Sequence, residues 1–193
     1  LWGVFGATYL LFATDVLGLT PAAIGLIVGM GGAGAFVGAL LAGRASRRFG
    51  VGPAMLVGMI GFTIGMAFIP LAPAGALLIG AIFLVAQQIV GDGAATVYEI
   101  ASVSVTQSVV DDRLIGRVNG TIRFVEDLFQ LGGTIAGGII GELLGLRVAA
   151  FVGLIGAFVA IAFLWFSPIR SLRTIPTHPA PLGLPGDDLP QTE

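Results

Sequence analysis

The chain alternates between long apolar segments and short polar connections. An apolar helix needs about 20 residues to cross the roughly 30 Å hydrocarbon core of a bilayer, and several segments reach or approach that length. The pattern predicts an all-α membrane protein with helices at residues 1–14, 21–43, 53–69, 75–107, 118–140 and 148–166. The remaining residues, 167–193, are polar and rich in proline, so we expect a disordered tail.

Two of these segments depart from the ideal length. Residues 1–14 are too short to span a bilayer, and we expect them to be the end of a truncated helix. Residues 75–107 would extend about 50 Å as one helix, so this segment must tilt, break or project from the bilayer. The glycines on either side of Asp92 offer a place for a break.

Composition places the chain in a membrane and excludes several kinds of site. Of its 193 residues, 56% are hydrophobic and only 10% are charged, with a mean hydropathy of +1.00, so the lipid bilayer is its first expected partner. There is no cysteine, and the single histidine, His178, lies in the tail, so we expect no metal and no cofactor. No predicted helix pairs a serine with a histidine, and scattered arginines do not form a stripe for nucleic acid. We therefore expect neither an enzyme nor a nucleic-acid-binding protein.

Glycine and alanine recur at four-residue steps in the predicted helices, a spacing that lets helix backbones approach closely in lipid. One helix should begin at Pro21 after an N-cap at Thr20, and its two glycine rows predict packing on two sides. Another row lies in 118–140. The residues expected to pack helices together are Gly25, Gly29, Gly34, Gly38, Gly133, Gly137 and Gly141.

Two carboxylates stand at membrane depth in the segment 75–107. Asp92 and Glu99 are seven residues apart, which is two helical turns, so both fall on one face. A charge at the bilayer centre costs roughly 2.5 to 3.5 kcal/mol on insertion scales, so such residues usually line a pathway or are paired. Asp92 either couples protons or makes a structural hydrogen bond, and Glu99 faces either the pathway or water. Gln87 and Gln88 either bind substrate or bridge helices.

A second polar stripe runs along the segment 118–140. Its members follow a three- and four-residue spacing: Arg123, Glu126, Asp127, Gln130 and Thr134. Either the charges pair within the helix and neutralise one another, or they line the same pathway. Arg123 is also close enough to the preceding loop to extend to the membrane interface.

The arginines fall on alternate connections and set the expected orientation. One side has only Arg147, whereas the loops RASRRFG and VVDDRLIGRVNG and the tail hold Arg44, Arg47, Arg48, Arg113, Arg117, Arg170 and Arg173. By the positive-inside rule, the arginine-rich side and the C-terminus are cytoplasmic.

Residues 39–48, with the sequence ALLAGRASRR, resemble the G-x-L-a-D-R-x-G-R-R signature of the major facilitator superfamily. Gly43 stands where the signature has aspartate, and Ser46 where it has glycine, so we interpret these arginines first as membrane anchors and helix-end charges. Six helices with both ends inside also resemble the C-terminal half of such a transporter. The resemblance implies a six-helix bundle of two inverted three-helix repeats, with a missing N-terminal six-helix half as its partner.

Further motifs are similar to the branch that holds macrolide efflux proteins and the enterobactin exporter. The branch usually has proline at Asp111 and a neutral residue at Glu99. The motifs that carry the likeness are Tyr98, Gln107, DRLIGRVN at 112–119, Leu131-Gly132, Gly137-Gly138, Gly145-Leu146-Arg147 and Ser167-Pro168-Ile169-Arg170. The resemblance implies a bacterial inner-membrane antiporter that exchanges protons for small amphipathic substrates, such as drugs or siderophores, in proton-coupled efflux.

Two classes of function stay open at this point. The first is one half of a secondary transporter, with its site formed against the other half near the bilayer midplane. The second is a non-transporting membrane module, such as an assembly partner encoded by a truncated gene. About six further helices upstream in the reading frame would favour the transporter.

The arginine asymmetry predicts which connections can be reached from outside the cell. Cysteines introduced at Ser46, Asp112 and Thr177 should be shielded from an impermeant thiol reagent in intact cells, whereas cysteines at Ala74 and Gly145 should be labelled. The reverse labelling pattern would contradict the orientation.

Overall fold

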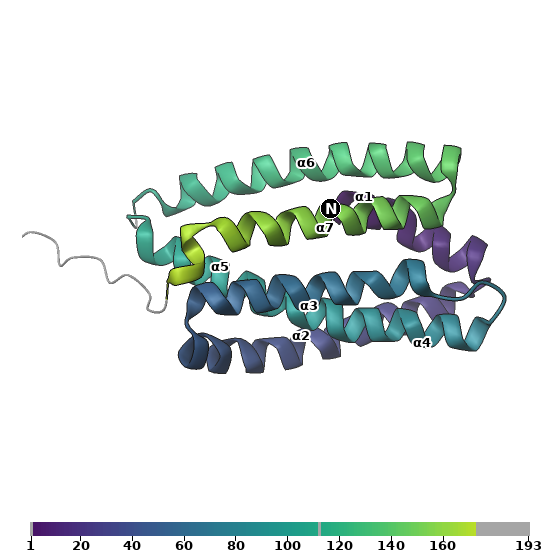
Figure 1. Ribbon diagram of the computed structural model, residues 1–193, viewed down its shortest axis with the longest axis horizontal. Coiled ribbons are helices and arrows are strands. Elements are labelled where there is room, and N and C mark those ends of the chain that lie inside the picture. Colours follow the sequence, from purple (N-terminus) through teal and green to yellow (C-terminus); the bar gives the residue numbers. More distant parts are fainter. Residues whose placement is uncertain (1, 112, 173–193) are drawn as a thin grey trace, which may run out of the picture.

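The computed structural model describes residues 2–111 and 113–172, and most of the expected tail, with Arg173 and His178, lies outside them. The described residues form helices and no strands, which confirms the prediction of an all-α protein. Figure 1 shows the elements as an elongated bundle. They are α1 (Trp2–Leu11), the π-helical turn η1 (Phe12–Val16), α2 (Pro21–Phe49), α3 (Val51–Leu71), α4 (Leu77–Gln87), the π-helical turn η2 (Gln88–Asp92), α5 (Gly93–Val109), α6 (Ile115–Leu144), α7 (Leu146–Phe166) and the 3-10 helix η3 (Pro168–Ser171).

Four helices of the described chain are long and apolar enough to cross a membrane. They are α2, α3, α7 and the continuous segment Leu77–Val109, which joins α4, η2 and α5. The sequence predicts six helices, but α1 is short and α6 carries charges along much of its length. Large apolar side chains such as Leu26 and Phe163 lie exposed on the surface of the bundle. Such a surface needs an apolar solvent, so the chain is a multi-pass membrane protein.

The start of α2 confirms the cap predicted from the sequence. The Thr20 side chain accepts a hydrogen bond from the backbone N–H of Ala23 at 3.3 Å, and Pro21 is the first helical residue. Proline is suited to this position because its missing N–H would have no partner inside the helix.

The end of α2 corrects the prediction of an arginine-rich loop. The helix continues to Phe49, so Arg44, Arg47 and Arg48 lie on its last turns. Arginine is a good helix former, and the negative end of the helix dipole favours cations there. Arg44 also donates a hydrogen bond from Nη1 to the carbonyl of Leu40 at 3.1 Å. The connection to α3 is a single residue, Gly50.

The predicted loop between α5 and α6 is also partly helical. Arg113 lies in the turn that joins the two helices, but Arg117 is already part of α6. Asp112 lies outside the described residues, and its neighbour Asp111 accepts a hydrogen bond from the backbone N–H of Arg113 at 2.9 Å.

The long segment Leu77–Val109 does not break at the glycines that flank Asp92. Instead, α4 passes into α5 through the π-helical turn η2, which ends at Asp92. A π turn holds one extra residue and occurs often at functional sites in helices. The turn therefore changes the direction of the side chains around Asp92 while the backbone stays helical.

The helices pack in two groups. α5 packs against both α2 and α3, whereas α1 packs against both α6 and α7, and α3 contacts α7 between the groups. Figure 1 shows α6 and α7 on one side of the bundle and α2 and α4 on the other. The main core, which includes Phe12, Ile69 and Leu84, joins five helices, and a smaller cluster around Ala54 and Ala101 joins α3 to α5.

Arg147 joins the two groups at one end of the bundle. Its Nη2 donates a hydrogen bond to the carbonyl oxygen of Ala72, which follows α3, at 2.6 Å. Its guanidinium carbon also lies 5.9 Å from the ring centroid of Phe12. The arginine thus satisfies a carbonyl that the end of α3 leaves free.

The chain after α7 differs from the expected disordered tail in its first residues. Pro168–Ser171 form η3, and the carbonyl of Leu172 accepts a hydrogen bond from the backbone N–H of Gly52 at 2.9 Å. This bond satisfies an N–H group at the start of α3, where a helix has no internal acceptor. The chain therefore folds back on α3 as far as residue 172.

Gly50 and Gly145 form two matching junctions, α2 to α3 and α6 to α7. Both have a φ of +95°, with ψ of 161° and 149°. This backbone region is essentially restricted to glycine, because a side chain there costs about 1 to 3 kcal/mol.

Replacing Gly145 by alanine should therefore lower the free energy of unfolding by about 1 to 3 kcal/mol. Gly138 is the matched control, because it lies within α6 and an added Cβ would meet nothing within 4 Å. Gly138→Ala should leave the stability unchanged or raise it slightly, since alanine is the better helix former. Thermal unfolding in detergent compares the two variants, and equal melting temperatures would contradict the prediction.

Candidate functional site

The Asp92 side chain, at the end of η2, lies against Gly31 of α2. A Cβ on Gly31 would collide with Oδ2 of Asp92 and would lie 2.9 Å from Nε2 of Gln88. Gln88 also donates a hydrogen bond from Nε2 to the carbonyl oxygen of Val28 at 3.3 Å. The missing side chain at Gly31 therefore leaves the room in which both polar side chains meet α2.

The Asp92 carboxylate has no hydrogen bond or ion pair with the residues that the structure describes. Its backbone carbonyl accepts a hydrogen bond from the Thr96 hydroxyl at 2.8 Å. The side chain is partly buried. The structure thus does not show the structural hydrogen bond that is the alternative to a functional role. A carboxylate without a partner in a membrane-spanning helix is costly, which points to a function.

Both tyrosines of the chain lie near intramembrane carboxylates. Tyr9 on α1 interacts electrostatically with Asp92, Asp92 with Glu99, and Tyr98 on α5 with Glu126 on α6. These interactions connect four elements of the bundle. The Tyr9 hydroxyl is buried without a hydrogen-bond partner among the described residues. Sequence reasoning missed Tyr9, although the rarity of tyrosine in this chain, two residues in all, was a usable signal.

The two glutamines before Asp92 differ in their surroundings. Gln88 makes the bridge to α2 that is one of its two predicted roles. Gln87 is 2% exposed, and its Oε1 has no hydrogen-bond partner in the described chain. Its Nε2 lies 3.3 Å from the position that a Cβ on Gly91 would occupy. Gln87 therefore brings an unsatisfied acceptor into the core directly beside η2.

The polar stripe of α6 lies on the exposed side of the helix. Arg123, Glu126, Asp127 and Gln130 are all exposed. No ion pair joins Arg123 to either acid in the part of the chain that the structure describes, so the structure does not show the self-neutralised pair. Glu126 interacts electrostatically with Tyr98 on α5. Among the described residues, no hydrogen bond or ion pair joins a member of the stripe to the Asp92 carboxylate.

Some of the predicted packing glycines lie at helix contacts, and others do not. A Cβ on Gly34 or Gly38 would collide with the backbone of η2 or α5. On α6, Gly133 and Gly137 lie against the backbone of α1, and Gly141 lies against the side chain of Leu146. By contrast, an added Cβ would meet nothing within 4 Å at Gly25 and Gly29. Only one of the two rows on α2 therefore packs against another described helix.

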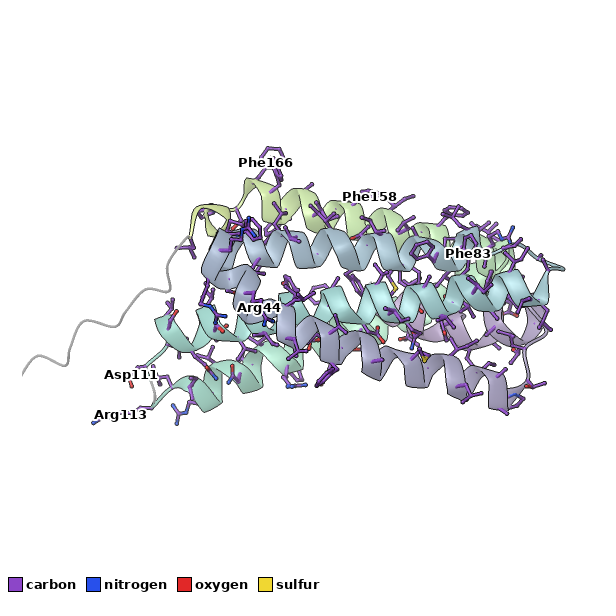
Figure 2. The ribbon with its side chains drawn as sticks, turned by 90° about the horizontal axis from the view of Figure 1, so that it is seen from below. Arg44, Phe83, Asp111, Arg113, Phe158 and Phe166 are labelled. Atoms are coloured by element: carbon purple, nitrogen blue, oxygen red, sulfur yellow. The ribbon has the colours of Figure 1, made fainter. Side chains whose placement is uncertain are left out.

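The arginines of the expected cytoplasmic motif lie toward one end of the bundle. Figure 2 shows Asp111 and Arg113 at that end, with Arg44 in the same half, and Phe83 toward the other end. No group of three or more histidine, cysteine or acidic side chains suited to a metal ion occurs within residues 2–111 and 113–172.

A family model described as the Major Facilitator Superfamily matches residues 1–187. No curated protein and no solved structure matches the chain.

The contact between α2 and η2 predicts three different effects of alanine on neighbouring glycines. Gly34→Ala should destabilise most, by about 1 to 3 kcal/mol, because its Cβ would lie 2.6 Å from the carbonyl oxygen of Ile89, which cannot move freely. Gly31→Ala should cost less, because the groups that it meets are ends of flexible side chains. Gly32→Ala is the control, since its Cβ would meet nothing within 4 Å. Melting temperatures in another order would contradict the helix contact.

Proposed function

The chain belongs to the major facilitator superfamily, and we propose that it is the six-helix half of a proton-coupled exporter of small amphipathic molecules. The family match and the apolar helices indicate a membrane transporter. Proton coupling, the direction of transport and a substrate such as a drug or siderophore are our proposal. The likeness to the macrolide efflux and enterobactin exporter branch supports this substrate class.

The observation that carries proton coupling is the unpartnered carboxylate of Asp92. An ionised carboxylate in a membrane span is costly unless it is paired, and protonation removes that cost. The Asp92 carboxylate lacks a hydrogen-bond or ion-pair partner among the described residues, and Asp92 lies at the end of the π-helical turn η2 and near Tyr9. A carboxylate in this position can hold a proton or stay ionised when a polar or cationic group approaches it.

Glu99 and the α6 stripe extend this polar face. Glu99 interacts with Asp92, and Glu126 interacts with Tyr98, so acidic groups continue from η2 toward the exposed side of α6. We propose that Arg123, Asp127 and Gln130 line the substrate pathway beside them. The exposure of these side chains at membrane depth supports a water-filled pathway, because lipid would not tolerate them.

The packing pattern supports two inverted three-helix repeats. In the first repeat α2 leads into α3 through Gly50, and in the second α6 leads into α7 through Gly145 with the same φ. The continuous segment of α4, η2 and α5 packs on α2 and α3, and α1 packs on α6 and α7 in the corresponding way. The two π-helical turns also correspond, because η1 follows α1 and η2 joins α4 to α5.

A second six-helix bundle is the partner that we propose for the open faces. Gly25 and Gly29 leave a smooth face on α2, and α6 exposes its charged stripe. Alternating access requires two bundles that move about a shared site. We propose that these two faces meet the other bundle in a bacterial inner membrane, with the arginine-rich end in the cytoplasm.

Replacing Asp92 by asparagine tests the coupling role. The change keeps the size and hydrogen-bonding capacity of the side chain but removes its titration. In the full-length transporter, Asp92→Asn should abolish efflux driven by a pH gradient while insertion and expression stay intact. The measurement is substrate efflux from everted vesicles with and without an imposed pH gradient.

Asp15→Asn is the matched control. Asp15 is exposed at the end of η1, where its carboxylate accepts a hydrogen bond from the Thr14 hydroxyl at 2.9 Å. Its replacement should leave pH-driven efflux unchanged. If Asp92→Asn pumps normally while a well-folded Glu126→Gln or Asp127→Asn does not, the coupling group lies on α6 and the proposal is wrong.

A further inference from the structure

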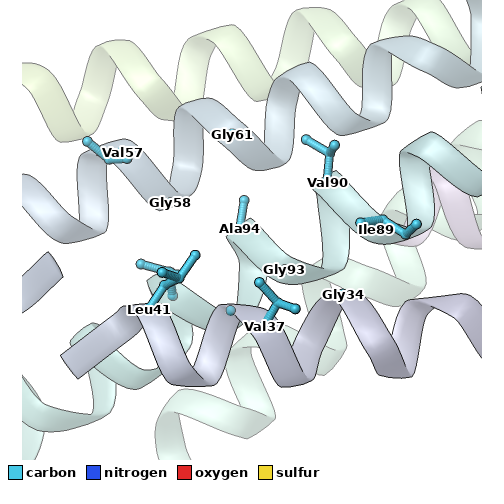
Figure 3. Close-up of a pocket in the computed structure, with 12 residues that line it drawn as sticks. Gly34, Val37, Leu41, Val57, Gly58, Gly61, Ile89, Val90, Gly93 and Ala94 are labelled. Atoms are coloured by element: carbon cyan, nitrogen blue, oxygen red, sulfur yellow. The ribbon is translucent and has the colours of Figure 1, made fainter. Parts of the chain in front are cut away.

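An apolar groove lies between α2 and α3, with η2 and α5 along its inner side (Figure 3). Its volume is about 320 Å³. Every residue that lines it is glycine, alanine, valine, leucine or isoleucine. The glycines bring the three backbones close together, while Val37 and Val57 stand at its sides and remain about half exposed. The groove therefore opens on the membrane-facing surface of the helices.

Neither water nor an empty space suits this groove. A bound water needs two to four polar partners, and no polar side chain lines the groove. An empty groove would forfeit the dispersion contacts of its lining. The surrounding solvent of these helices is hydrocarbon, so a hydrocarbon chain is the occupant that the lining favours.

The positive charges at one end of the groove indicate the kind of lipid. The α2 residues that line it, at positions 34, 37, 38 and 41, follow helical spacing. The same stripe continues to Arg44 and Arg48, whereas Arg47 falls on the neighbouring face. No carboxylate forms an ion pair with these arginines in the described part of the chain. Arg44 donates one hydrogen bond from Nη1 to the carbonyl of Leu40, and the guanidinium carbon of Arg48 lies 5.6 Å from the ring centroid of Phe49. The remaining N–H groups of both guanidinium groups are available to a phosphate.

We propose that this groove binds one acyl chain of an anionic phospholipid, whose phosphate lies against Arg44 and Arg48. The apolar lining selects a hydrocarbon chain, and the two arginines select a negative headgroup. This site is separate from Asp92 and does not depend on which substrate the protein transports.

Photo-crosslinking in lipid nanodiscs tests the proposal on the full chain. The probes are phosphatidylglycerol and phosphatidylcholine that carry the same diazirine in the acyl chain. Phosphatidylglycerol should label the groove segments 34–41 and 57–61 several-fold more than the exposed surface of α7 around Val159. Phosphatidylcholine should label the groove less. Equal labelling of the groove and of α7 would mean that the probes report only the surrounding lipid. Equal labelling of the groove by both lipids would exclude selection of an anionic headgroup. Either result overturns the proposal.

Matched variants separate the groove from the general surface. Val57→Phe fills the groove and should reduce its labelling several-fold. Val159→Phe makes the same change on α7, at a residue of similar exposure (64%, against 60% for Val57). This control should leave the labelling of the groove unchanged. Arg44→Gln should remove the preference for phosphatidylglycerol, and Arg47→Gln should keep it. Val37→Phe repeats the first test if Val57→Phe unfolds. Unchanged labelling in a folded groove variant, or crosslinks to a second copy at the groove, would overturn the proposal.

Discussion

The close approach of α2 to η2 and α5 determines the position of most other features of this bundle. In hydrocarbon, helices gain no hydrophobic drive toward one another, so they associate through backbone contact at small residues. Gly34 and Gly38 allow that contact here, because any side chain on them would meet the backbone of η2 or α5. The same approach brings Asp92 and Gln88 onto Gly31 and leaves the apolar groove between α2 and α3. One helix contact thus sets both a polar site and a surface groove.

The two sets of polar groups differ because their surroundings differ. Asp92 lies at a helix contact, so its charge is partly shielded from water and has no cation beside it among the described residues. Glu126 and Asp127 lie on an open helix face, where water can solvate them. This difference is why we propose proton coupling for Asp92 and substrate contact for the α6 stripe.

Sequence reasoning recovers the features that depend on local chemistry. Apolar length and period predict helices, and Thr20 with Pro21 predicts the start of α2. It misses Gly31, because that glycine stands outside the four-residue rows and matters only through what η2 places opposite it. It leaves open whether the segment around Asp92 tilts, breaks or projects, and it does not identify the π turn that the chain makes there. The predicted arginine-rich loop is wrong because the polarity of Arg44 suggests a loop, while arginine also favours helix ends.

Contacts between the two helix groups determine where motion can occur. α3 packs on α7, the main core joins α1 to α4, and Arg147 holds the end of α3. Movement of one group against the other would expose buried apolar side chains and leave the Ala72 carbonyl without its donor. The side of α2 with Gly25 and Gly29 and the charged side of α6 make no such contacts with other described helices, so movement at these two faces breaks no packing within the bundle. This packing supports the proposal that the bundle moves as a unit against a partner on those two faces during alternating access.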